Sequence, residues 1–142
     1  MTSEEMARSY IKIAEHSLKE ARLAYEDKLW HLAVRRSQES VELALKGALR
    51  LLGVEIPRTH DVSFHLRENR SRFPDWFQLQ IDKLAHISRS LCKDRQLSFY
   101  GDEEMALPPE LIFSRFDAED AIQNASFVLD LSKRLLEEFT TQ

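Results

Sequence analysis

This sequence is poor in the residues that break helices or cross-link chains. Its 142 residues include three glycines, four prolines and one cysteine, Cys92. A lone cysteine excludes an intramolecular disulfide and a cysteine-based zinc site within one chain. The glycines and prolines lie between long periodic stretches, whereas a β-sandwich places turn residues roughly every eight to twelve positions. This scarcity favours an all-helical protein.

Long apolar runs are absent as well. No stretch reaches the roughly 18 apolar residues that mark a membrane-spanning helix, and the opening Met-Thr-Ser-Glu-Glu has no basic start followed by an apolar run. We therefore expect neither a membrane span nor secretion, and the single cysteine fits a cytoplasmic protein. The net charge of −4 argues against duplex DNA as a partner, although a local basic patch can still bind phosphates.

The remaining composition is that of an ordinary globular protein. Hydrophobic residues make up 43% of the chain and charged residues 31%. No internal repeat, low-complexity tract or change in composition marks a linker. We therefore expect one domain over residues 1–142.

Apolar residues recur at intervals of three and four in four long segments, which predicts four amphipathic helices. The segments are residues 3–26, residues 28–52, residues 74 to about 99–101, and a last helix capped by Asp117. Thr2 and Glu5 suit a capping box at the first start, and Gly53 suits a left-handed stop after the second helix. The predicted buried stripe of the first helix is Met6, Tyr10, Ile13, Ala14, Leu18, Ala21 and Tyr25.

Shorter elements are predicted between the long ones. After an extended connector over 54–57, Thr59 or Asp61 caps a short helix that runs to about Arg70. About fifteen irregular residues separate the last two long helices, and Pro109 opens one helical turn among them. The predicted fold is an all-α, up-and-down antiparallel four-helix bundle with one extra short helix between its second and third long helices. Cys92 is expected in the core.

Four sequence segments together resemble the HEPN domain family, named for higher eukaryotes and prokaryotes nucleotide-binding. They are Arg-Arg-Ser-Gln-Glu-Ser-Val-Glu-Leu-Ala-Leu-Lys at 35–46, Gly-Val-Glu-Ile-Pro-Arg-Thr-His-Asp at 53–61, Phe-Tyr-Gly-Asp-Glu at 99–103 and Phe-Ser-Arg-Phe-Asp-Ala-Glu-Asp-Ala at 113–121. The resemblance implies an up-and-down four-helix bundle that commonly dimerises and is often encoded beside a minimal nucleotidyltransferase. Some relatives are metal-independent RNases or toxins, and others have no established chemistry.

The chain departs from the pattern of the nuclease members. Those proteins carry an Arg followed, after four to six residues, by a His on the third long helix. Here His86 is the only histidine on that helix, and no arginine precedes it at the required distance. Arg58, His60 and His65 are the remaining catalytic candidates, in which an imidazole would take a proton from a ribose 2′-hydroxyl while a guanidinium stabilises the phosphorane oxygens.

Ligand-binding candidates are polar residues that a nucleotide or RNA phosphate would contact. They are Arg36, Lys46, His60, Asp61, Arg89, Arg95 and Tyr100. Structural roles compete with each assignment: Glu42 and Lys46 stand four apart and suit an ion pair. Thr59 or Asp61 suits a helix cap while His60 bonds back to the bundle. The two histidines at 60 and 65 are five apart, which does not suit a shared metal ion.

The leading hypothesis is a non-catalytic, dimeric HEPN-like module that pairs with a nucleotidyltransferase and binds a nucleotide or RNA, as in a toxin–antitoxin system. We expect no metal and no cofactor. The alternatives are a metal-independent RNase toxin and a purely structural dimer.

Overall fold

The computed structural model describes residues 2–56 and 58–141, and within these ranges the chain is helical without any strand. The long helices are α1 (Ser3–Glu26), α2 (Trp30–Leu51), α5 (Ile81–Tyr100) and α7 (Arg115–Thr140). The short ones are α3 (Ser63–Glu68), a 3-10 turn (Arg70–Arg72), α4 (Asp75–Gln78) and α6 (Pro109–Ile112). In the ranges described, none of the helices is long and apolar enough to cross a membrane.

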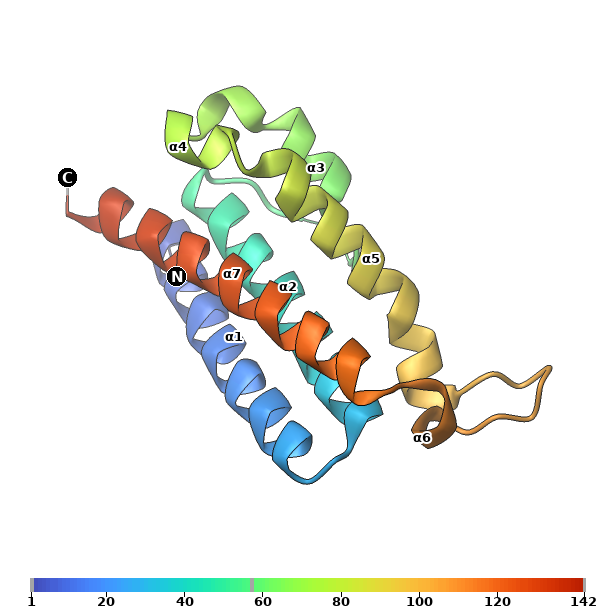
Figure 1. Cartoon of the computed structure of the whole chain (residues 1–142). Helices are drawn as coiled ribbons and strands as arrows, with labels where there is room; N and C mark the ends of the chain where they lie inside the picture. The colour runs from blue at the N-terminus through green and yellow to red at the C-terminus, as the bar shows by residue number, and fades with distance from the viewer. Residues whose placement is uncertain (1, 57, 142) are drawn as a thin grey trace.

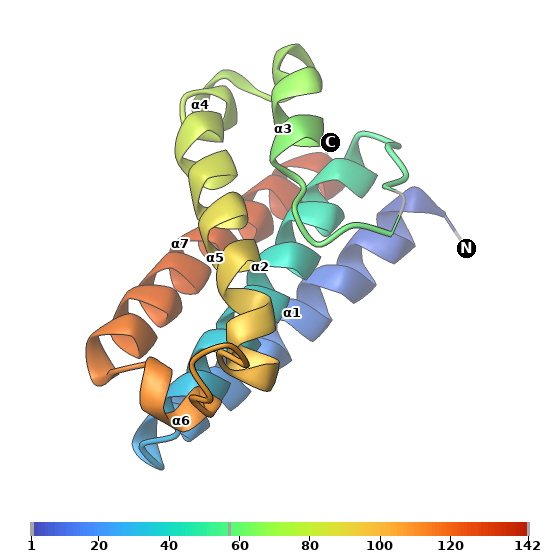
Figure 2. The ribbon, with the colours of Figure 1, turned by 90° about the vertical axis from the view of Figure 1, so that its right-hand side faces the viewer.

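Helix α2 is the centre of the bundle. It forms an antiparallel hairpin with α1, α7 lies along both of them, and α5 packs against another side of α2 (Figure 1). Figure 2 shows α3 and α4 at one end of α5, and the connector before α3 passing beside α2. This arrangement confirms the predicted four-helix bundle. It forms because the apolar stripes of the four long helices leave water by facing one another.

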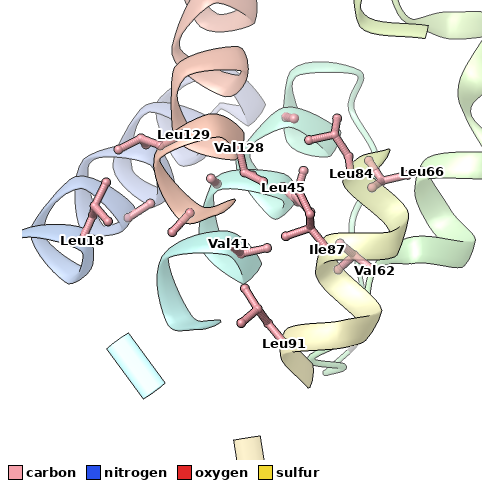
Figure 3. Close-up of a cluster of buried hydrophobic side chains, with 14 of the residues drawn as sticks. Leu18, Val41, Leu45, Val62, Leu66, Leu84, Ile87, Leu91, Val128 and Leu129 are labelled. Carbon is pink, nitrogen blue, oxygen red and sulfur yellow. The ribbon is translucent and has the colours of Figure 1, made fainter. Parts of the chain in front are cut away.

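The core lies where α2 meets α5 and α7. Figure 3 shows Val41 and Leu45 of α2 pointing toward Ile87 of α5 and Val128 of α7, and all four side chains are buried. Each fully buried aliphatic side chain contributes about 1.5–3 kcal/mol relative to an exposed one. The helices of the bundle are therefore held together mainly by this apolar cluster.

Glycine is required where α1 crosses α2. A Cβ placed on Gly47 would lie 2.8 Å from Ile11 Cγ1 and 3.2 Å from the Ala7 carbonyl oxygen. Gly47 therefore lets the two backbones approach closely. Gly53 has a different role, since its φ of 78° is the left-handed stop predicted after α2.

The prediction of one continuous third long helix is wrong, because this segment is broken into α4 and α5. Arg70 Nη1 donates to the Gln78 carbonyl oxygen at 3.2 Å, and Gln78 Nε2 donates to the Phe73 carbonyl oxygen at 2.7 Å. These bonds hold the end of α4 against the preceding turn. The apolar pattern conceals the break, since Phe77 and Ile81 are four residues apart and are both buried.

The last helix begins earlier than predicted. Ser114 is its N-cap, and Asp117 stands three residues later as the second member of a capping box. Ser114 N donates to Asp117 Oδ2 at 2.8 Å, and Asp117 N donates to Ser114 Oγ at 3.4 Å. The capping box of Thr2 and Glu5 is confirmed, as is the helical turn that Pro109 opens.

Several predicted core positions are less buried than expected, and among them Met6, Tyr10 and Tyr25 of α1 are only half-buried. Ile13 is 46% exposed, because Ile11 and Ala7 instead turn toward α2. Cys92 is only half-buried, on the flank of α5. The predicted extended connector ends at Pro57, which lies outside the described residues.

Candidate functional site

The side of α2 that faces away from α7 carries charged residues at successive helical turns. This open face comprises Arg35, Glu39, Glu42, Lys46 and Arg50, all of intermediate burial. Their spacing of three and four residues aligns them along the helix. Helix α1 borders the open face on one side, while α5 and the connector with His60 border it on the other.

Glu42 is the centre of a polar network on this face. Its Oε1 lies 2.7 Å from His60 Nδ1 and accepts from Gln38 Nε2 at 3.1 Å, while its Oε2 accepts from Lys46 Nζ at 3.1 Å. Burial alone raises the pKa of Glu42, but the hydrogen bonds from His60, Lys46 and Gln38 outweigh it, and the net pKa is lowered. The geometry confirms the interpretation in which His60 bonds back to the bundle, and with it the Glu42–Lys46 ion pair.

Asp61 holds the same connector against α5. Its Oδ1 accepts from Ser63 N at 2.9 Å and from Ser88 Oγ at 3.2 Å. Burial raises the pKa of Asp61, but hydrogen bonds from Ser63 and Ser88 and the nearby Arg89 cation bring it below its ordinary value. The predicted cap of α3 by Thr59 or Asp61 is wrong, because the N-cap of this helix is Val62, without a side-chain cap. Asp61 and Thr59 instead fix the connector just before it, where Thr59 Oγ1 donates to the Asp61 carbonyl oxygen at 3.1 Å. The Asp61 carboxylate is occupied by protein donors.

Two arginines meet on one aromatic ring at the other end of the open face. Arg35 Cζ lies 3.8 Å from the centroid of the Phe99 ring, and Arg95 Cζ lies 5.0 Å from it. Arg35 Nη2 also donates to the Ser98 carbonyl oxygen at 2.7 Å, one of the orphan carbonyls at the end of α5. Among the side chains that the structure describes, no carboxylate lies within ion-pair distance of Arg35 or Arg95.

This pair of guanidinium groups has no ion-paired carboxylate among the described residues, and Glu39 is the nearby carboxylate that acts on Arg35. Burial, followed by the repulsion of Arg36 and Arg95, lowers the pKa of Arg35, although Glu39 acts in the opposite direction. The Nε of Arg35 is buried and has no hydrogen-bond partner among the described residues. Tyr100 lies beside the pair and is 66% exposed. Cations held together without a counter-charge favour an anionic ligand.

The other candidates lie apart from this pair or are already paired. Arg36 bonds Glu20 at 3.0 Å and Glu39 at 2.9 Å. Arg58 lies in a separate pocket, and His65 on α3 lies 3.9 Å from Glu68. Within residues 2–56 and 58–141, no group of three His, Cys, Asp or Glu side chains could hold a metal ion.

Comparison with known proteins agrees with the fold and the residue patterns. The family model described as "HEPN domain" matches residues 7–135. The chain belongs to the HEPN domain family. The crystal structure of ST0689, an archaeal HEPN homologue, is 30% identical, with 92% of this chain and 97% of that chain covered and a TM-score of 0.71. TT1696 from Thermus thermophilus shares the fold at 23% identity, with 91% and 97% covered and a TM-score of 0.74. No curated protein matches.

Sequence reasoning missed the residues that complete both ends of this HEPN domain's open face. Arg95 and Tyr100 were candidates, but Arg35 and Phe99 were not, since no local spacing links α2 to the end of α5. The only available signal was the interval of four between Arg95 and Phe99 on α5. Tyr10 and Arg50, which line a pocket with Lys46 and Arg58, were missed for the same reason.

Proposed function

We propose that this HEPN domain is a binding module for the phosphate of a nucleotide or of RNA. The observation that carries the proposal is the Arg35–Arg95 pair, two guanidinium groups on one Phe99 ring without an ion-paired carboxylate among the described residues. Guanidinium groups bind phosphate oxygens in a forked geometry and stack on aromatic rings. The exposed Tyr100 ring beside them offers a surface on which a base can stack.

The proposal is tested by titrating uridine 5′-monophosphate into the protein by calorimetry. Arg35→Gln and Arg95→Gln should each weaken binding about tenfold, the scale of one charge-assisted hydrogen bond. Arg22→Gln is the matched control, because Arg22 is exposed and lines a different cleft, between α1 and α7. Equal affinity in all three variants, or no binding by the wild-type protein, would contradict the proposal. Because Arg35 also bonds the end of α5, circular dichroism of each variant checks folding.

A second candidate, a metal-independent RNase, is favoured by one specific contact. His60 and Arg95 line the same cleft of about 200 Å³, and the 2.7 Å contact with Glu42 occupies His60 Nδ1. With Nδ1 donating, Nε2 is left as an acceptor. It could take the proton of a ribose 2′-hydroxyl, whose oxygen then attacks the adjacent phosphorus and expels the 5′-oxygen while Arg95 stabilises the charge.

The RNase candidate is tested by expression toxicity and RNA cleavage. If induction harms cells, and if the purified protein produces ends with 2′,3′-cyclic phosphate that His60→Ala abolishes, the domain is an enzyme. Phosphate binding that survives in His60→Ala without any cleavage by the wild-type protein supports the binding module instead.

We further propose that the domain acts in the cytoplasm as a homodimer beside a nucleotidyltransferase partner. Exposed apolar side chains support a protein interface around α6 and the loop before it. They are Met105, Leu107, Leu111 and Phe116. Light scattering should give twice the mass of 16.6 kDa, and co-expression with a neighbouring nucleotidyltransferase should give a stable complex. A monomer that captures no such neighbour would contradict this part of the proposal.

A further inference from the structure

A second basic pocket lies on the open face, at the opposite end of α2 from Arg35. Tyr10 of α1 lines it together with Lys46 and Arg50 of α2. The connector residues Glu55, Ile56 and Arg58 complete a pocket of about 280 Å³. The pocket thus joins an aromatic hydroxyl with three cationic side chains from two separate segments.

The charge of this pocket is positive, and its cations are only partly neutralised. Arg50 Nη1 bonds Glu55 Oε1 at 2.9 Å, but the Glu55 side chain is 83% exposed and Arg50 only 13%. Arg50 Nε is buried without a partner among the described residues. Lys46 uses one of its three donors on Glu42, at 3.1 Å. An exposed carboxylate is a weak partner, because solvent screens its attraction.

Arg58 is the least neutralised cation of the pocket. It is exposed, and among the residues described no carboxylate lies within ion-pair distance of it. A phosphate held there would meet the guanidinium of Arg58, the remaining donors of Lys46 and the hydroxyl of Tyr10, and would compete with Glu55 for Arg50. A phosphate group, with its negatively charged oxygens, therefore suits these cationic donors better than a neutral ligand does.

We propose that this pocket is a second phosphate site, and that the ligand is therefore a single-stranded RNA lying along the open face. The inference rests on the proposed function, which supplies the first phosphate site at Arg35 and Arg95. Fifteen residues of α2 separate Arg35 from Arg50, a distance of about 22 Å along the helix. One nucleotide cannot span this distance, whereas a stacked strand rises about 3.4 Å per nucleotide and covers it in about six or seven.

The surface between the two sites suits bases better than phosphates. Ile13 and Leu43 contribute apolar side chains to the intervening cleft, and Ile13 is exposed there. Glu39 and Glu42 also line the cleft, but Arg36 and Lys46 respectively pair with them. A strand with phosphates at the two ends and bases over Ile13 places each chemical group on a matching surface.

The test measures binding of three probes to the full chain: octauridylate with 2′-O-methyl sugars, uridine 5′-monophosphate and inorganic phosphate. We expect the octamer to bind more than tenfold tighter than the monophosphate. Arg58→Ala should weaken octamer binding about tenfold and lower the slope of log K against log salt by about 0.7, the value for one phosphate contact with a single strand. Binding of the monophosphate at Arg35 and Arg95 should not change.

Control variants separate the possible failures. Arg22→Ala removes a charge from another cleft and should leave all three affinities unchanged. Arg50→Lys keeps the positive charge but loses the forked guanidinium group. It should weaken the binding of the octamer and leave the binding of the other two probes unchanged. If the monophosphate binds but the octamer binds no tighter, or if Arg58→Ala binds the octamer like the wild type, the second site is refuted and the proposed function stands. Two equal sites for inorganic phosphate without octamer preference also refute the RNA strand. If no probe binds, the proposed function fails first.

Discussion

The two sides of α2 are stabilised in different ways. Toward α7 and α5 it presents Val41 and Leu45, which are buried among side chains of the same chemistry. On the open face it presents Arg35 and Glu42, whose partners come from the end of α5 and from the connector before α3. The apolar side needs only neighbours of suitable volume, whereas the polar side needs specific atoms at hydrogen-bond distance.

This difference determines where stability and function reside. Apolar burial is non-directional, so the packed side of α2 tolerates rearrangement and determines the fold. Charged groups held together without full neutralisation are costly to fold and are ready to bind a counter-ion. The packed side should therefore dominate the free energy of unfolding, and the open face should dominate ligand affinity.

The largest expected effect on stability is at the packed side. Leu45→Ala should lower the free energy of unfolding by about 2–5 kcal/mol, because Leu45 is fully buried and its removal leaves a cavity. Urea denaturation measures the change. Ile13→Ala is the matched control, since Ile13 has the same apolar chemistry but lies on the open side of α1, and should cost well below about 1 kcal/mol. Equal losses at the two positions would contradict the division between the faces.

The next effect comes from the polar network. Glu42→Ala should destabilise the fold by about 1–3 kcal/mol, because it leaves the buried Gln38 amide and the half-buried Lys46 ammonium without their acceptor and releases His60. Faster amide exchange in the connector around His60 should accompany the loss. Glu39→Ala, which removes a neighbouring carboxylate whose partner among the described residues is Arg36, should cost less. A larger loss in the Glu39 variant would show that the Glu42 network does not hold the connector.

The same difference explains how much of this molecule could be predicted from sequence. The packed stripe on α5 was predicted correctly, because helical periodicity places apolar side chains on one face without reference to the rest of the chain. The break between α4 and α5 could not be predicted, since it depends on Arg70 reaching the Gln78 carbonyl oxygen. Individual site residues such as Arg95 were found, but their partner Arg35 depends on how α2 lies against α5.

Gly47→Ala tests the third side of α2, which meets α1. An alanine in a helix is normally better than glycine by about 1 kcal/mol. Here the new Cβ would lie 2.8 Å from a buried Ile11 side chain and close to the Ala7 carbonyl oxygen, so we expect a net loss of about 1–2 kcal/mol. Thermal unfolding measures it. A stabilised Gly47→Ala variant would mean that α1 can move away from α2 at little cost.

A pH series tests whether the charge of Glu42 stabilises the fold. Its pKa is lowered on folding, so its contribution is present above the unfolded pKa and is lost as the pH falls through the folded pKa. The stability difference between wild type and Glu42→Gln should therefore shrink from pH 7 toward pH 3 in urea titrations. Asp94→Asn is a control of opposite sign, because burial and Asp117 raise the pKa of Asp94. That variant should be more stable than wild type at pH 7, with the gain lost in acid.

The smallest expected effect separates two neighbouring arginines. Arg36 pairs with Glu20 and Glu39 through partly exposed side chains, so Arg36→Gln should cost about 0.5 kcal/mol or less, and the cost should vanish in high salt. Its charge is already neutralised, so the variant should bind uridine monophosphate nearly as well as wild type. Arg35→Gln should bind it weakly, because Arg35 has no carboxylate partner among the described residues. If Arg36→Gln weakens nucleotide binding as much as Arg35→Gln does, then the net charge of the surface attracts the phosphate, and the unpaired arginines have no special role.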